Sequence, residues 1–180
     1  MMALPGSTAE FQRQSEDRQN HDYAPNLVKF EAVFRVDLWE PFKAFCEEVR
    51  GLGVDVVCET SLSTFAQATS DQARPVVILF AHWTGSLLEF SDGLKTIDQV
   101  IDAVPGAFDG LIDLCVCHPE PLTRLLIRRR PRMVVKDLSV EATPSYWFKF
   151  YARVFHYLKE QPQSFVRAHE RARAEQLSRG

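Results

Sequence analysis

A histidine and a cysteine each stand at the end of one of the two most apolar segments of the sequence. His82 directly follows residues 75–81 (PVVILFA), and Cys117 closes residues 110–117 (GLIDLCVC). An imidazole can take the proton of a thiol, and the resulting thiolate is a strong nucleophile. The two side chains therefore have the chemistry of a Cys–His dyad, with Cys117 as the nucleophile and His82 as the general base.

The segments around these two residues alternate between strand and helix patterns. We predict strands at residues 27–36, 54–58, 75–81, 87–90, 110–117 and 132–136, and helices at residues 38–50, within 59–73, and at 96–104, 120–129, 144–159 and 163–176. This order predicts an α/β fold with a mainly parallel central sheet and helices on both faces. Because the carboxyl ends of parallel strands meet at one sheet edge, we expect His82 and Cys117 to lie close together.

Strand geometry gives this site expected dimensions. We expect the His82 imidazole about 4 to 7 Å from the Cys117 sulfur, with the backbone N–H of Gly85 available to an oxyanion. In a continuous strand, Cys115 lies about 6.7 Å below Cys117 on the same face, and it is the alternative nucleophile. Asp113 lies deeper on that face, where a buried carboxylate needs hydrogen-bond donors or a cation.

Each of these residues also has an ordinary structural interpretation. A thiol in a buried strand is usually a packing residue, and a histidine after a strand often serves as a hydrogen-bonding residue. The four cysteines, at positions 46, 58, 115 and 117, contain no CxxC pair that would indicate a redox or metal motif. The joint position of His82 and Cys117 after the two most apolar segments favours the dyad.

The order of these segments resembles the caspase-like cysteine peptidases, the clan of caspases, metacaspases, separases and bacterial CHAT domains. VVILFAHWTG is similar to the histidine motif of the clan, FDGLIDLCVC to its cysteine motif, and SLLEFSDGLKTIDQVIDAV to the hairpin and helix that CHAT domains have between them. The resemblance implies a caspase-like three-layer sandwich over residues 26–180, after a flexible leader at residues 1–25. It also implies an S1 pocket in which Asp113 selects Arg or Lys, as in metacaspases.

The function that the resemblance implies is that of a cysteine endopeptidase. Its substrate would be a protein, in a bacterial stress or defence system and with a regulatory partner protein. The alternative is a catalytically silent caspase-like adaptor, because Trp83 and Thr84 separate His82 from Gly85, where the clan has glycine directly after its histidine. A nucleotide- or flavin-binding domain ranks last, because no glycine-rich phosphate loop is present.

Composition excludes several other classes of protein. The 180 residues are 46% hydrophobic and 25% charged, and the net charge of −3 gives no basic excess for nucleic acid or anionic membranes. We find neither a signal peptide nor an apolar run of about 20 residues, and we expect a cytoplasmic protein.

The remaining histidines lack metal-ligand spacing, so we expect no metal and no cofactor. Arg128, Arg129 and Arg130 predict a solvated helix end.

Overall fold

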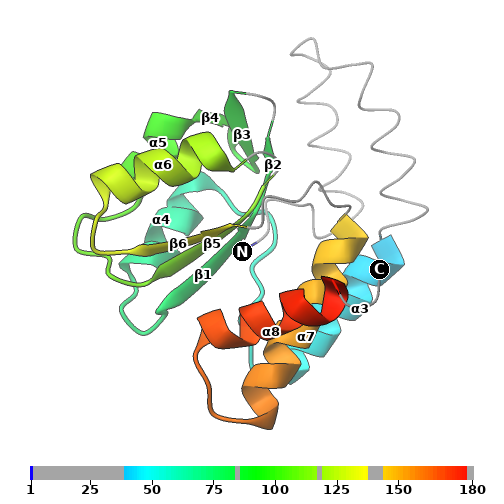
Figure 1. Cartoon of the computed structure of the whole chain (residues 1–180). Helices are drawn as coiled ribbons and strands as arrows, with labels where there is room; N and C mark the ends of the chain where they lie inside the picture. The colour runs from blue at the N-terminus through cyan, green and yellow to red at the C-terminus, as the bar shows by residue number, and fades with distance from the viewer. Residues whose placement is uncertain (2–38, 84–85, 117–118, 138–143, 178–180) are drawn as a thin grey trace. The chain divides into compact units, whose positions relative to one another are not determined.

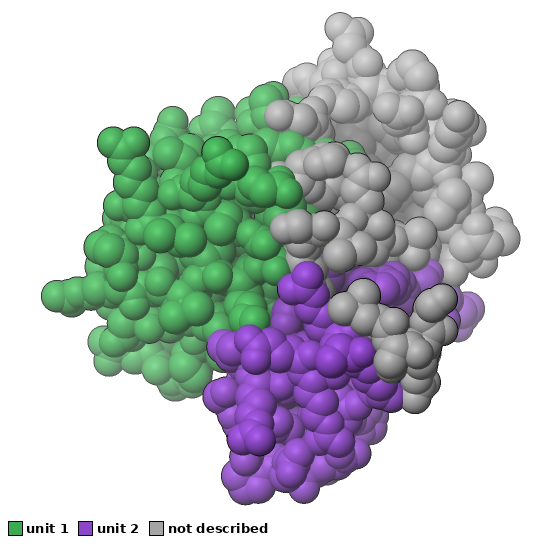
Figure 2. Space-filling view, viewed as in Figure 1, with its two compact units in different colours: residues 1–17, 57–141 green, residues 18–56, 142–180 purple. Residues whose placement is uncertain are grey.

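Two compact units make up the described part of the chain. The computed structural model describes residues 1, 39–83, 86–116, 119–137 and 144–177. The sheet unit contains Met1 and the described residues from 57 to 137, and the helical unit contains residues 39–56 and 144–177 (Figure 1, Figure 2). The predicted strand at residues 27–36 and the predicted leader beyond Met1 lie outside the described residues.

The described elements follow the predicted order, apart from two short strands that were not predicted and a predicted strand at residues 54–58 that is absent. They are α3 (Trp39–Gly51), α4 (Leu62–Ser70), β1 (Val76–Phe80), β2 (His82–Trp83), β3 (Leu87–Phe90), β4 (Gly93–Thr96), α5 (Ile97–Ala103), β5 (Leu111–Cys115), α6 (Glu120–Arg129), β6 (Val134–Asp137), α7 (Pro144–Glu160) and α8 (Phe165–Leu177). All six helices of the described residues were predicted: α4 lies within the predicted range 59–73, and the bounds of the other five agree within two residues. None of the described helices is long and apolar enough to cross a membrane.

Three parallel strands form the main sheet, in the order β1-β5-β6. The register of β1 and β5 runs from Val76 opposite Leu111 to Phe80 opposite Cys115. Every side chain of β5 is buried, as a central parallel strand requires. The prediction of a mixed α/β fold around a parallel sheet is therefore confirmed.

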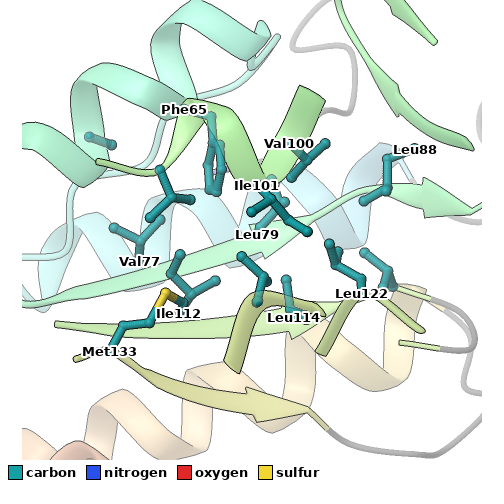
Figure 3. Packing of buried hydrophobic residues seen from close by; sticks show 14 of the residues in the cluster. Phe65, Val77, Leu79, Leu88, Val100, Ile101, Ile112, Leu114, Leu122 and Met133 are labelled. Atoms are coloured by element: carbon teal, nitrogen blue, oxygen red, sulfur yellow. The ribbon is translucent and has the colours of Figure 1, made fainter. Parts of the chain in front are cut away.

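An aliphatic core joins one face of this sheet to three helices. Val77 and Leu79 of β1 and Ile112 and Leu114 of β5 share this face (Figure 3). They form one buried cluster with side chains of α4, α5 and α6, among them Phe65, Val100, Ile101, Leu122 and Leu126. Complete burial of one such aliphatic side chain contributes about 1.5–3 kcal/mol. The cluster therefore holds β1 and β5 side by side and fixes where their carboxyl ends lie.

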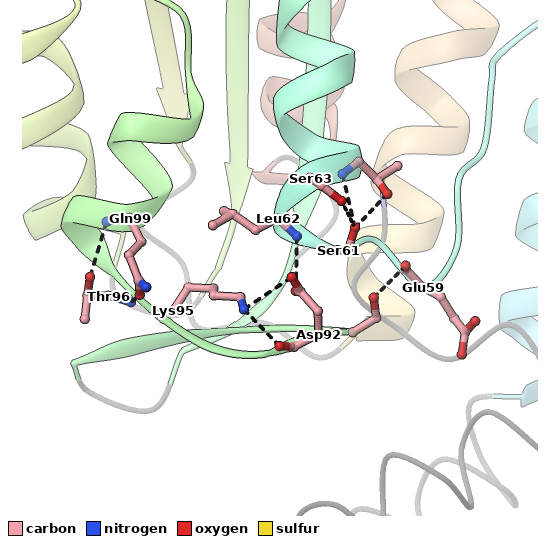
Figure 4. Close-up of polar contacts among 10 residues, drawn as sticks. Glu59, Ser61, Leu62, Ser63, Asp92, Lys95, Thr96 and Gln99 are labelled. Atoms are coloured by element: carbon pink, nitrogen blue, oxygen red, sulfur yellow. Dashed lines mark hydrogen bonds and ion pairs between the residues drawn. The ribbon is translucent and has the colours of Figure 1, made fainter.

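A small antiparallel sheet, β2-β3-β4, follows β1 along the chain. Strands β3 and β4 form a hairpin in which Phe90 lies opposite Gly93, whose φ of +102° suits glycine. The sequence predicted β3 and the turn but neither of the short strands β2 and β4. Polar contacts hold the hairpin tip: Asp92 Oδ1 accepts a hydrogen bond from the Leu62 N–H at 3.1 Å, at the start of α4 (Figure 4).

Helix α5 begins at Ile97, one residue after the predicted start, and Thr96 is its N-cap. The Thr96 hydroxyl oxygen accepts a hydrogen bond from the Gln99 backbone N–H at 3.2 Å, and the Gln99 side chain accepts one from the Thr96 N–H at 2.8 Å (Figure 4). These reciprocal bonds are a capping box, which satisfies two backbone donors that the first helical turn leaves open.

Two predicted strands are wrong in whole or in part. Residues 54–58 form no strand, although they are rich in valine, and the boundary between the two units falls between Val56 and Val57. Strand β5 ends at Cys115 and does not continue through Val116. Strand formation needs a partner, and β1 ends at Phe80, the residue opposite Cys115. Local sequence patterns do not contain this information.

Two arginines of the predicted solvated helix end also contact α5, Arg129 at an exposed position and Arg130 at a partly buried one. Arg129 contacts Asp98 and Asp102, with both nitrogen–oxygen distances at 2.6 Å. The Arg130 guanidinium donates to the carbonyl oxygens of Val104 at 2.7 Å and Ile101 at 3.1 Å. These side chains join α6 to α5 and satisfy carbonyls at the carboxyl end of α5.

The helical unit has an aromatic core. The rings of Phe45 on α3 and Phe148 on α7 stack at 5.1 Å, and Phe150 lies edge to face with the His169 imidazole of α8 at 4.9 Å. Both Phe150 and His169 are buried. Such aromatic pairs contribute about 0.5–1.5 kcal/mol beyond the area that they bury, so they are a principal source of stability for these helices.

Candidate active site

In the sequence, His82 and Cys117 follow two strands that end side by side at the carboxyl edge of the parallel sheet. Phe80 at the end of β1 lies opposite Cys115 at the end of β5, and the next strand, β6, ends at Asp137. In the sequence, His82 comes two positions after Phe80 and Cys117 two positions after Cys115. Cys117 and Gly85 lie outside the described residues, so their roles and the expected distance from Cys117 to His82 stay predictions.

His82 is the predicted site residue that the structure describes most fully. Strand β2 places its side chain on the solvent side, whereas the next residue, Trp83, is buried in the aliphatic core. Among the described residues, the His82 imidazole has no side-chain hydrogen bond. An exposed imidazole of this kind can accept a proton from a neighbouring thiol or from a ligand.

The predicted alternative nucleophile, Cys115, is a buried cysteine with little accessible surface. It is 6% exposed, and strand alternation puts it on the sheet face opposite the aliphatic core, together with Asp113. This common face agrees with the predicted order, in which Asp113 lies below Cys115. A buried thiol is less accessible to a protein substrate than an exposed one.

Asp113 lies in the middle of β5 and has no exposed surface. The strand register puts it directly beside Ile78 of β1 and Lys136 of β6, on the same face of the sheet. A carboxylate in such a place is costly unless cations or hydrogen-bond donors surround it. The position of Lys136 therefore fits the structural interpretation of Asp113, and its S1 role stays a prediction.

The outer face of the small sheet contains a residue that the sequence analysis did not select. The register puts Glu89 of β3 opposite His82 on one side and opposite Leu94 of β4 on the other. Alternation in β3 buries Leu88 and Phe90 and turns Glu89 outward. That alternation is visible in the sequence, but the pairing is not, because a strand of two residues has no periodic signal.

Other charged groups of the hairpin are already paired. The Lys95 ammonium donates to the Asp92 carbonyl oxygen at 2.9 Å and lies 3.2 Å from the Asp92 carboxylate (Figure 4). Lys95 lies opposite Leu88, which points into the core, so its position in β4 belongs to the other face of the sheet from Glu89. The described residues contain no group of three or more His, Cys, Asp or Glu side chains that could hold a metal ion.

Comparison with known proteins does not assign this site to a family. The sequence matches no protein-family model, and no curated protein matches it.

Proposed function

We propose that the protein is a cysteine endopeptidase that cleaves a protein substrate with a Cys117–His82 dyad. The observation that carries the proposal is the paired ending of β1 and β5 at Phe80 and Cys115. The exposed His82 and the thiol of Cys117 each follow these paired ends by two residues. Because His82 and Cys117 both lie two residues beyond paired strand ends, we expect their side chains at the same edge of the sheet.

The proposed reaction uses these two side chains in sequence. His82 takes the proton from the Cys117 sulfur, and the thiolate attacks the carbonyl carbon of a peptide bond to form a carbon–sulfur bond. The imidazolium then gives its proton to the nitrogen of the departing amine as the carbon–nitrogen bond breaks. Water, deprotonated by His82, hydrolyses the thioester and regenerates the thiol. The backbone N–H of Gly85 is the proposed donor to the oxyanion.

The proposal takes the parallel sheet as the centre of a caspase-like three-layer sandwich. Two features support this fold: the parallel order of β1 and β5, and the hairpin and helix between His82 and β5. The resemblance to CHAT domains favours a protein substrate in a bacterial stress or defence system, with a partner protein that regulates cleavage.

Cleavage of a diverse peptide mixture tests the proposal without knowledge of the natural substrate. Peptides from a digested proteome are incubated with the wild-type protein, with Cys117→Ala and with Cys115→Ala, and new peptide ends are identified by mass spectrometry. We expect wild type and Cys115→Ala to give the same new ends, and Cys117→Ala to give none, because loss of the nucleophile removes most of the rate. Equal cleavage by wild type and Cys117→Ala, or no cleavage by wild type, contradicts the proposal.

A catalytically silent adaptor is the second candidate function. It is favoured by two large apolar side chains that remain half exposed on neighbouring elements, Ile127 of α6 at 51% and Val134 of β6 at 50%. Large exposed apolar side chains can contribute to a protein–protein interface. The peptide experiment separates the two functions, because an adaptor gives no cleavage with any of the three variants.

A further inference from the structure

Helix α6 presents an exposed face that combines positive charge with an apolar side chain. Its buried side, with Leu122 and Leu126, packs into the aliphatic core. Helical periodicity puts residues 124, 127 and 128 on the opposite side, and all three are exposed. Ile127 is 51% exposed, more than any other large apolar side chain of the described residues. We call Arg124, Ile127 and Arg128 the outer face of α6.

The arginines of this face differ from most other arginines of the sheet unit. Among the described residues, Arg124, Arg128 and the exposed Arg132 take part in no ion pair and no side-chain hydrogen bond. The other described arginines of the unit contact carboxylates or carbonyl oxygens of the chain; they are Arg74, Arg129 and Arg130. The cations of the outer face are therefore available to an anionic partner.

Positive charge is concentrated on this short stretch of the chain. Residues 120–132 contain five arginines and one acidic residue, Glu120, whereas the whole chain has a net charge of −3. Arg124 and Arg128 are one helical turn apart, so their like charges repel each other. A bound anionic group relieves this repulsion, because it lies beside both cations.

The apolar side chain indicates which kind of anionic partner fits. Arginine pairs well with carboxylates and with phosphates, so charge alone does not separate a protein from a nucleic acid. Removal of Ile127 from water stabilises a complex only if the partner places an apolar group against it. Helix α6 contains no aromatic side chain on which a base could stack. A protein segment with acidic and apolar side chains fits both features.

We infer that the outer face of α6 binds an acidic segment of a partner protein. Its carboxylates pair with Arg124 and Arg128, and one large apolar side chain packs against Ile127. The two arginines are separated by about 6 Å along the helix axis, which is close to the spacing of about 6.6 Å between alternate residues of an extended segment. Arg132 supplies a further cation just beyond the helix. The inference uses neither His82 nor Cys117, so it stands or fails separately from the proposed peptidase activity.

Selection from a phage-displayed library of random short peptides tests this inference without knowledge of the natural partner. The selection is made with wild type and with a control variant, Arg167→Gln/Arg173→Gln. Arg167 and Arg173 are exposed on α8 in the helical unit, so the control removes two positive charges away from α6. We expect both proteins to enrich peptides in which Asp or Glu residues accompany one large apolar residue.

The affinity of the most enriched peptide is then measured by fluorescence anisotropy. We expect Arg124→Gln/Arg128→Gln to weaken binding about tenfold or more, because two charge-assisted contacts are lost. Ile127→Ser should weaken it about threefold to tenfold, because apolar contact area is lost. Replacement of the apolar residue of the peptide by serine should weaken binding to wild type but not further weaken binding to Ile127→Ser. Circular dichroism of each variant establishes that the fold is retained.

Three results contradict the inference. The first is that wild type enriches no peptide, or enriches peptides without acidic residues. The second is that Arg167→Gln/Arg173→Gln weakens binding as much as Arg124→Gln/Arg128→Gln, which would make the effect one of net charge. The third is that a labelled single-stranded RNA binds wild type more tightly than the peptide and loses affinity in Arg124→Gln/Arg128→Gln, which would assign the face to nucleic acid.

Discussion

The histidines of the two units differ in what surrounds their rings. In the helical unit, His169 is buried against the rings of Phe150, Tyr151 and Phe165, and His156 Nε2 lies 2.8 Å from Glu48 Oε1. In the sheet unit, the His82 side chain is exposed, and its strand partner is Glu89. His169 is thus a core residue of the helical unit and His156 contacts Glu48 at an exposed position, whereas the exposed His82 has no side-chain hydrogen bond among the described residues.

The two units also differ in the side chains that form their cores. The sheet unit packs aliphatic side chains between parallel strands and three helices, and the helical unit packs aromatic rings of α3, α7 and α8. A parallel sheet brings the ends of distant segments to one edge, where reactive groups can meet. The three packed helices bury aromatic rings between them but have no sheet edge at which strand ends meet. For this reason our proposal assigns the chemistry to the sheet unit.

The largest expected effect tests the aromatic core. Phe150 is fully buried and contacts the rings of Tyr146, Trp147, Tyr151 and His169. We expect Phe150→Ala to lower the free energy of unfolding by about 3–5 kcal/mol, measured by urea denaturation. Phe155→Ala on the same helix is the control and should cost clearly less, because Phe155 is only half-buried. Equal losses would mean that the aromatic core is not centred on Phe150.

An intermediate effect tests the link between α5 and α6. Arg130→Met removes the hydrogen bonds to the Val104 and Ile101 carbonyls and retains much of the side-chain volume. We expect a loss of about 1.5–3 kcal/mol, because charged donors to buried carbonyls are strong. Arg128→Met, at an exposed position of the same helix, should change stability by less than about 0.5 kcal/mol. Similar losses for both variants would contradict the stabilising role of the Arg130 hydrogen bonds.

A smaller effect tests the capping box of α5. We expect Thr96→Ala to lower the free energy of unfolding by about 1 kcal/mol, because the Gln99 N–H loses its acceptor. Thr96→Ser keeps the hydroxyl and should retain most of that stability. If Thr96→Ser lowered the free energy of unfolding as much as Thr96→Ala does, the loss would come from the threonine methyl group and not from the cap hydrogen bond.

The smallest effect appears only at high pH, in the helical unit. The Tyr157 hydroxyl donates to the Glu175 carboxylate, and this bond, with partial burial and the negative charge of Glu175, raises the pKa of Tyr157 above its ordinary value of 10.0. The folded protein therefore holds the phenolic proton more tightly than the unfolded chain does. The resulting stabilisation is complete below about pH 10 and is lost as the pH rises through the folded pKa.

Urea titrations of wild type and Tyr157→Phe at about pH 8, 10 and 11 measure this effect. The stability difference between the two proteins should shrink as the pH rises, because only wild type loses the contribution of the phenolic proton. A difference that stays constant or grows contradicts the role of the Glu175 hydrogen bond.

Most of the fold could be predicted because its signals are local. The aliphatic run before His82 identified β1, and the helix predicted at residues 96–104 matches α5 within one residue at each end. Strand pairing could not be predicted in the same way. The valine-rich residues 54–58 form no strand, and β5 ends at Cys115, because both outcomes depend on partners far away in the sequence.

The candidate site was predictable to a similar extent. The position of His82 after β1 follows from the sequence, and the structure puts its side chain on an exposed face. The pairing of His82 with Glu89 does not follow from it, because a strand of two residues has no periodic signal in the sequence. The hydrogen bonds from Arg130 to carbonyl oxygens of the α5 segment could not be predicted either, because they join residues far apart in the sequence.

The central claim is that His82, and not a histidine of the helical unit, activates Cys117. The most direct test is the rate of Cys117 alkylation by iodoacetamide at neutral pH in wild type, His82→Gln and His156→Gln. His156 already contacts Glu48, so His156→Gln is the matched control. We predict that His82→Gln lowers the rate by about tenfold or more, and that His156→Gln leaves it unchanged. Equal rates in all three proteins would contradict the account.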